Sequence, residues 1–244
     1  IHDAGIAGLG SSQASGLTLE QVNALSTGQI AGLSSDALSG FSLAALEVLT
    51  PEKLAAISST GMKGLSTAFI VTLSAGEIAA LGTSAIAGLS SDQIHAMSND
   101  QLDALSLAQI AALGSSGLAG LTTSQLTTFS TEELAALNTA AIRGLPTAVV
   151  AALTTEDIGA LTTGQMAALG YNQVAAMTTT QLGSLTMTQV GALTAIQAAA
   201  LGADDLAAFS PENIMSLSST AISGLSTAVL AALPTEQAQA FTAG

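Results

Sequence analysis

The feature that most constrains this chain is an eight-residue repeat that runs along the whole sequence without an insertion. Counted from Ile1, every eighth residue through Phe241 is Leu, Ile, Met or Phe, in all 31 cases. Position two of this octad is Ser or Thr in 22 of 31 cases, and position six is Ile, Leu, Val or Met in 27 of 30. So regular a short repeat makes the octad the unit of structure and predicts a solenoid whose neighbouring units share one core.

Each octad carries the signals of a helix start. Ser or Thr at position two, followed three residues later by Gln or Glu, forms a capping box, as at Thr18 and Gln21. The apolar residues at positions one and six, such as Leu25 and Ile30, form the accompanying hydrophobic staple. A continuous helix fits poorly, because eight residues over two turns need roughly 4.0 residues per turn instead of about 3.6. We therefore expect one helix of about six residues per octad, followed by a corner.

Acidic residues, prolines and glycines lie where a short helix favours them. Of the 17 acidic residues, ten lie at position four and four at position five, near the positive end of the helix dipole. Pro51 and Pro211 lie at the first helical position, whereas Pro146 and Pro234 replace the cap. Nine glycines lie at position eight. We expect them to end the helices and to allow close approach at the corner.

These signals predict an all-α solenoid of very short helices, one per eight-residue repeat, with positions one and six in a continuous core. A β-solenoid is the alternative, because positions six, eight and the next one are in part apolar. Ala, Leu, Gln and Glu favour helix over strand, however, and a capping box has no role in a strand. The number of octads in one superhelical turn and the handedness stay open, because adjacent octads look equivalent.

A period of 80 residues, or ten octads, is superimposed on the repeat. Residues 49–72, 129–152 and 209–232 align at this offset within what we treat as a single array over residues 1–244, with no atypical terminal unit. In the third octad of each block, position five is apolar, at Phe69, Val149 and Val229. One interpretation is duplication with local adjustment of the core. The other makes these three the candidate interaction residues for a partner or a neighbouring copy.

Composition excludes several classes of protein. The chain is 49% apolar and 8% charged, yet Ser, Thr, Gln, Asn and Gly interrupt every apolar run before the roughly 18 residues of a membrane span. A net charge of −14, with Lys53, Lys63 and Arg143 as the only strong cations, excludes a nucleic-acid binder and argues against docking on anionic lipid. The absence of Cys excludes disulfides and thiolate metal sites. No signal peptide is visible, and the chain starts at Ile1 instead of Met, as expected of a fragment or a processed product.

No catalytic, metal or cofactor motif is present. His2 and His95 are the only imidazoles, and His95 is expected to be a solvated side chain. The acid pairs lack the EF-hand and glycine-rich calcium patterns, so we interpret them as charges at helix N-termini. These pairs are Glu132–Glu133, Glu156–Asp157 and Asp204–Asp205. We expect a chain that is not an enzyme and that needs no cofactor.

Runs such as LTTGQMAALGYNQVAAMTTTQLGSLTMTQVGAL, residues 161–193, resemble the L-[ST]-x-x-Q-[ILV]-x-A arrays of very large, acidic, cysteine-free secreted or surface proteins of Proteobacteria, including adhesin-like giants. The resemblance spans the whole chain. It implies an extracellular or cell-surface location and a structural or adhesive role, and it supplies no functional residue.

Two functional hypotheses follow. The first is a structural scaffold that associates with itself end to end or laterally, because an uncapped solenoid exposes a cross-section of its core. The second is a solenoid groove that binds a peptide or a glycan, which a cluster of Tyr171, Phe69 and Arg143 on one face would favour. Ser or Thr at position three in 18 of 31 octads could in addition bind ice or carry glycans, although simple solubility explains these hydroxyls as well.

Overall fold

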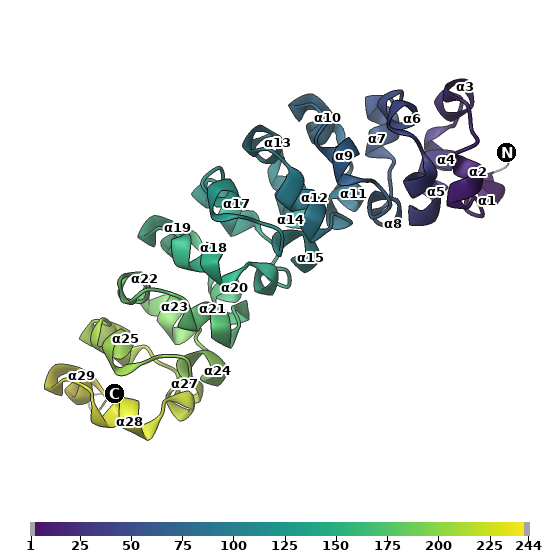
Figure 1. Cartoon of the computed structure of the whole chain (residues 1–244). Coiled ribbons are helices and arrows are strands. Elements are labelled where there is room, and N and C mark those ends of the chain that lie inside the picture. The colour runs from purple at the N-terminus through teal and green to yellow at the C-terminus, as the bar shows by residue number, and fades with distance from the viewer. Residues whose placement is uncertain (1–2, 242–244) are drawn as a thin grey trace. The chain divides into compact units, whose positions relative to one another are not determined.

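The computed structural model describes residues 3–241, and it is helical, with no strand in that range (Figure 1). Each octad from residues 1–8 to residues 233–240 contains one short helix. All are α-helices of four to six residues, except in residues 137–144, where the three-residue 3-10 helix η1 forms. This confirms the prediction of an all-α solenoid with one helix per octad, and it rules out the β-solenoid.

The chain divides into two compact units. The first comprises residues 1–128 and 136–138, and the second comprises residues 129–135 and 139–244. The helices of the first unit are α1 (Asp3–Ile6), α2 (Ser11–Ala14), α3 (Leu19–Asn23), α4 (Thr27–Gly32), α5 (Ser35–Gly40), α6 (Leu43–Glu47), α7 (Pro51–Ala55), α8 (Ser59–Met62), α9 (Thr67–Ile70), α10 (Ala75–Ala80), α11 (Thr83–Ala87), α12 (Ser91–Ala96), α13 (Asn99–Asp103), α14 (Leu107–Ala112), α15 (Ser115–Leu118) and α16 (Thr123–Leu126). After α17 (Thr131–Ala136), the second unit continues with η1 (Ile142–Gly144), α18 (Thr147–Ala152), α19 (Thr155–Ala160), α20 (Thr163–Ala168), α21 (Tyr171–Ala175), α22 (Thr179–Gly183), α23 (Met187–Gly191), α24 (Ala195–Ala198), α25 (Ala203–Ala207), α26 (Pro211–Met215), α27 (Ser219–Gly224), α28 (Thr227–Ala231) and α29 (Thr235–Ala240).

Three octads make one turn of the solenoid in both units. The extensive contacts between helices join elements that are three octads, or 24 residues, apart, such as α7 with α10 and α10 with α13 in the first unit. In the second unit α22 packs on α25, and α25 packs on α28, in the same way. The number of octads per turn, which the sequence leaves open, is therefore three.

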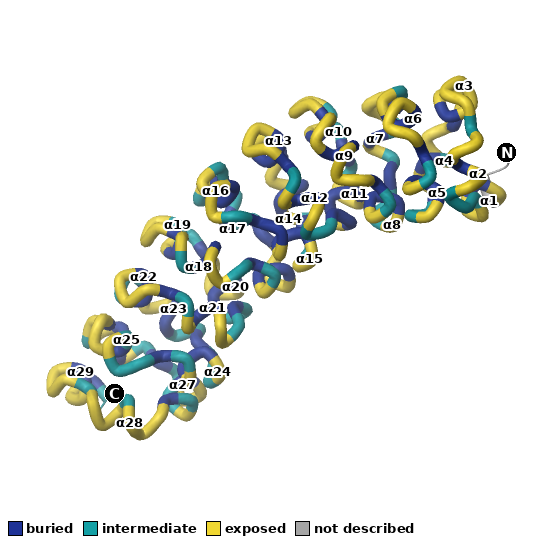
Figure 2. The backbone as a smooth tube through the Cα atoms, viewed as in Figure 1, coloured by how far each residue is buried: buried dark blue, intermediate teal, exposed yellow. Residues whose placement is uncertain are grey.

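The core follows octad positions one and six. Ile86 and Ile94, at position six, are fully buried, and Leu89, which lies between them at position one, is 3% exposed. Figure 2 shows the result along the chain, where short buried stretches alternate with exposed ones in each unit. The prediction of a core at these two positions is confirmed within each unit.

Helix starts follow the predicted capping chemistry. The Thr18 hydroxyl accepts a hydrogen bond from the backbone N–H of Gln21, and the Gln21 side chain accepts one from the N–H of Thr18. Pro51 lies at the first helical position of α7, and Pro146 and Pro234 occupy the cap positions of α18 and α29. Thr50, just before Pro51, forms no such backbone cap. Its hydroxyl pairs with the Glu52 carboxylate and lowers the pKa of that group.

Five of the nine position-eight glycines lie where two backbones approach closely. In the described part of the chain no glycine has a positive φ, so these helix ends do not use the left-handed conformation. A Cβ on Gly88 would instead lie 2.2 Å from the carbonyl oxygen of Ser59, at the start of the neighbouring helix α8. The same steric limit recurs at four other position-eight glycines, Gly40, Gly64, Gly120 and Gly224. These glycines let two successive turns touch through their backbones.

Candidate functional site

The polar side chains that converge in this structure are the glutamines at octad position five. Gln93 of α12 is 2% exposed, and its Nε2 donates hydrogen bonds to the carbonyl oxygens of Met62 and Leu65, both at 2.8 Å. Its Oε1 accepts from the backbone N–H of Ser90 at 2.9 Å. One carboxamide thus closes the capping box of its own helix and binds the preceding turn of the solenoid.

This arrangement recurs along both units at a fixed spacing. The Nε2 of a position-five glutamine donates to the carbonyls 31 and 28 residues earlier, which lie at position six of one octad and position one of the next. We call these residues the inter-turn glutamines. Both bonds form, for example, at Gln93, Gln101, Gln109 and Gln125 in the first unit, and at Gln173, Gln181, Gln189 and Gln197 in the second.

The accepting carbonyls lie at the C-terminal end of a short helix, where the backbone bonds of the α-helix stop and the position-six carbonyl accepts from the N–H three residues later. Gln101, for example, donates to Ile70 at the end of α9 and to Leu73 at the corner that follows. Each inter-turn glutamine therefore caps the start of its own helix and the end of a helix in the turn before. A helix of five residues, too short to persist alone, is in this way held at both ends.

Other residues at position five form only part of this contact. The Lys53 ammonium donates to the backbone carbonyl of Asn23, so that a different donor binds the preceding turn at the end of α3. Asn213, a shorter amide, reaches only the carbonyl of Leu185, at 2.8 Å. Gln237 donates to Phe209 at 3.4 Å, and its buried Oε1 has no partner, because Pro234 at the cap has no N–H to donate.

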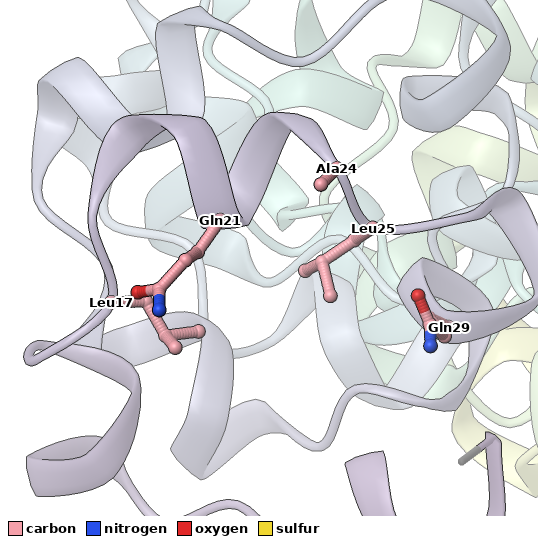
Figure 3. A pocket seen from close by; sticks show the side chains of 5 residues that line it. All are labelled: Leu17, Gln21, Ala24, Leu25 and Gln29. Atoms are coloured by element: carbon pink, nitrogen blue, oxygen red, sulfur yellow. The ribbon is translucent and has the colours of Figure 1, made fainter. Parts of the chain in front are cut away.

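At the N-terminal side of the first unit the same positions form an open hollow of about 290 Å³ (Figure 3). Its lining residues, which we call the N-terminal face, are Leu17, Gln21, Ala24, Leu25 and Gln29. Gln21 and Ala24 are exposed there, whereas Gln93, the equivalent of Gln21 three turns further on, is buried. The hollow is the place that a preceding turn occupies elsewhere in the solenoid.

The C-terminal side of the second unit shows the complementary surface. Leu230 is 36% exposed, although other position-six residues such as Ile214 are 1% exposed, and Leu233 and Val229 are half-buried. No side chain among the described residues donates to the carbonyls of Leu230 and Leu233, which correspond to the acceptors of an inter-turn glutamine. We call Val229, Leu230 and Leu233 the C-terminal face.

The three candidate interaction residues do not share one environment. Phe69 and Val149 are each 1% exposed and lie in the core of their own units, as the local-adjustment interpretation expects, and Val229 belongs to the C-terminal face. Val149 and Val229 are ten octads apart, which is not a multiple of three, so they lie on different sides of the second unit's solenoid. Burial also keeps Phe69 from forming a surface cluster with Tyr171 and Arg143. Whether the three residues contribute to association stays a prediction.

The remaining sequence candidates lie at the surface. His95 is exposed, and His2 lies outside the described residues. The acid pairs lie in the first turns of α17, α19 and α25, as expected of helix N-terminal charges. Within residues 3–241 no three His, Asp or Glu side chains lie close enough together to hold a metal ion. No helix described there is long and apolar enough to cross a membrane.

Sequence reasoning assigned the position-five glutamines to capping alone and missed their second set of hydrogen bonds. The sequence signal for these bonds is the preference for Gln over Glu at position five. A capping box accepts Gln or Glu, yet position five is Gln in 13 octads and Glu in two, at Glu77 and Glu133. Only Gln carries the N–H donors that the carbonyls of the preceding turn require.

The sequence model of the ALTTAQ repeat family matches three segments of the chain, residues 70–107, 128–163 and 160–195. The letters of that name correspond to octad positions eight, one, two, three, four and five. Residues 160–165 read ALTTGQ, with the helix cap at Thr162 and the inter-turn donor at Gln165. No curated protein matches the chain. The matched segments are thus a tandem repeat region similar to ALTTAQ repeats, and the capping box and the inter-turn bond account for the Thr and the Gln of that pattern.

Proposed function

We propose that this chain is a structural repeat scaffold, without enzymatic activity, in an extracellular or cell-surface protein. The proposal is based on what the converging polar side chains bind. The inter-turn glutamines are buried and donate to backbone carbonyls, so the groups that meet inside each turn hold the array together. The repeat match supports the same role.

The extracellular location rests on the resemblance to acidic, cysteine-free surface arrays and on a net charge of −14 without Cys. Antibodies raised against the chain test it on intact cells of the source organism and on the culture medium. We expect labelling of intact cells, or recovery of the protein from the medium. Labelling that requires cell lysis would contradict the location.

A scaffold is defined by its core and not by one patch of its surface, so its turns are expected to be interchangeable. Residues 89–112 and 161–184 are two such three-octad blocks, and each has Gln at position five of all three octads. We expect a chain in which residues 161–184 replace residues 89–112 to keep its helix content and the parent protein's cellular role. Loss of the role in a folded chain would show that residues 89–112 recognise something specific.

A further inference from the structure

Two methionines at the surface of the second unit line one hollow. Met187, the first residue of α23, is 57% exposed, and Met215, the last residue of α26, is 55% exposed. The other methionines of the chain are at most 6% exposed and lie in the core, at Met62, Met97, Met166 and Met177. The hollow has a volume of about 290 Å³ and is open to solvent. We call it the methionine hollow, and its lining residues are Met187, Glu212, Met215 and Ser216.

The methionine hollow lies between two turns that both have described neighbours. In the second unit α20 packs on α23, α23 packs on α26, and α26 packs on α29, so another turn covers each outer side of the pair. Met187 is at octad position three and Met215 at position seven, where the repeat mostly has Ser or Thr and Ala or Gly, respectively. The hollow is therefore apolar because of these two residues.

Large apolar side chains rarely occupy these two positions together. Met187 and Met215 are 28 residues apart, from position three of one turn to position seven of the next. In the sequence one other pair at these positions and this spacing is large and apolar on both sides. It consists of Leu43 and Val71 in the first unit, which are 42% and 53% exposed. Ala68 there takes the place of Glu212, so the methionine hollow is the one of the two that combines apolar walls with a carboxylate.

The charges of the second unit determine which ligand suits the hollow. Glu212 is exposed, and Glu236 lies at the same octad position one turn later, on α29. The sequence of this unit contains eight acidic residues and a single Lys or Arg, Arg143, whose Nε donates to the carbonyl of Ala168 at 2.9 Å. A ligand that pairs with Glu212 therefore has to bring its own cation. A second copy of this chain, with three Lys and Arg in 244 residues, is a poor source of one.

We propose that the methionine hollow binds a basic amphipathic segment of a partner protein. An apolar side chain of that segment enters between Met187 and Met215, and a Lys or Arg of the segment pairs with Glu212. Met suits such a surface, because its flexible thioether adapts to side chains of different shape. The acidic surroundings attract a cationic segment before contact. This goes beyond the proposed scaffold role, since it assigns a partner to one place on the array.

The first test uses a short amphipathic peptide composed only of Leu and Lys as the probe. It is titrated into the 244-residue chain labelled with ¹³C in the methionine methyl groups. We expect the Met187 and Met215 signals to shift, whereas the signals of the four core methionines stay in place. A peptide with Glu in place of every Lys is expected to bind at least about tenfold more weakly. Equal affinity for the two peptides, or titration without a shift of the Met187 and Met215 signals, overturns the proposal.

Substitutions then separate the apolar walls from the charge. The double variant Met187→Thr, Met215→Ala restores residues that the repeat uses at positions three and seven, and we expect it to bind the Leu–Lys peptide at least about tenfold more weakly. Glu212→Gln is expected to bind about threefold more weakly at low salt. Ile196→Ala is the matched control, because it removes a side chain of α24 that is 66% exposed and does not line the hollow. An equal loss in the control and the double variant contradicts the proposal.

Oxidation tests the unsubstituted chain. Dilute hydrogen peroxide transfers one oxygen atom to a thioether sulfur and leaves as water, and the resulting sulfoxide is polar. We expect the intact mass to show two added oxygen atoms, located at Met187 and Met215, because the other methionines are buried. Peptide binding should then be lost, and unchanged binding after both are oxidised overturns the proposal. The interchange of turns, which tests the scaffold role, does not involve the hollow, so the two proposals fail separately.

Discussion

At the scale of single residues, the side chain at octad position five determines how tightly two turns are joined. Gln satisfies three backbone groups at once, two carbonyls of the preceding turn and the N–H of its own cap. Lys53 and Asn213 satisfy fewer of these groups, and an acid at the same position keeps the capping bond, as Glu133 does. Since a buried polar group without a partner costs about 1–3 kcal/mol, changes at this position are expected to have large and specific effects.

Gln181 allows the role of the amide donors to be measured. In Gln181→Glu the capping bond to Thr178 can form, but the donors to Val150 and Leu153 are lost and a carboxylate is buried beside two carbonyls. We expect a loss of roughly 3 kcal/mol in the free energy of unfolding at pH 7. Gln181→Met, which removes the donors without adding charge, is expected to lose less.

The deficit of Gln181→Glu should depend on pH with a defined sign. Burial beside carbonyl oxygens raises the pKa of the new carboxyl in the folded state above its unfolded value of about 4.3. Stability is therefore highest below that value, where the carboxyl is neutral in both states, and falls as the pH rises from there through the folded-state pKa. Urea unfolding at pH 4 and pH 7 checks this, and equal deficits at both values would contradict it.

Pro234 allows the opposite experiment, in which a missing partner is supplied. Pro234→Thr provides an N–H for the orphaned Oε1 of Gln237 and a hydroxyl cap for α29. We expect α29 to become more protected against amide hydrogen exchange, by roughly fivefold, after the loss of the proline's conformational restriction is counted. Pro146→Thr is the control, because Val149 at position five has no oxygen to satisfy. An equal gain in both variants would show that the hydroxyl cap alone is responsible.

At the scale of elements, the helices are too short to exist outside the stack, and what they contact decides their stability. Their starts could be read from the sequence, because Ser or Thr before Gln is a local signal. The three-octad turn and the inter-turn bonds could not, because both depend on which octads meet in space and all octads look alike. The glycines likewise could be predicted only in part. The sequence shows that they recur at position eight, but it does not show that the Ser59 carbonyl leaves no room for a side chain at Gly88.

Substitution of two glycines separates packing from helix propensity. A methyl group on Gly88 would meet the backbone of α8, so Gly88→Ala is expected to destabilise the first unit by about 2–3 kcal/mol. Gly76, inside α10, has nothing within 4 Å of its added Cβ. Gly76→Ala is therefore expected to stabilise by up to about 1 kcal/mol through helix propensity. Thermal unfolding of both variants measures the difference, and a loss of stability in both would argue against close approach as the reason for Gly88.

At the scale of the whole molecule, the contacts between helices are periodic in both units, so the array has no single centre. Stability is then a sum over turns and over the interfaces between them. The 80-residue superrepeat does not match the 24-residue turn, because ten octads are three turns and one octad more. Within the second unit, the block at residues 209–232 consequently begins one side further round than the block at residues 129–152, and their equivalent surface residues do not line up along one side.

Deletions test the length of the turn. Removal of residues 89–112 deletes three octads and leaves Gln125 opposite the carbonyls of Ile70 and Leu73, which Gln101 uses in the intact chain. We expect this chain to fold with unchanged helix content per residue. Removal of residues 89–100 shifts the register by half an octad, and each core side chain displaced in this way costs about 2–5 kcal/mol. Circular dichroism and urea unfolding compare the two, and similar behaviour would contradict a register set by whole octads.

The spacing of the inter-turn bonds has a consequence for how the chain acquires its structure. The bonds of the inter-turn glutamines reach back 31 residues at most, so no segment has to wait for a distant one before it can close. Folding speed depends on such sequence separations, because the entropy lost in bringing two segments together grows with the length of chain between them. A growing end can therefore add one turn after another onto the part already formed, in the order in which the chain is synthesised.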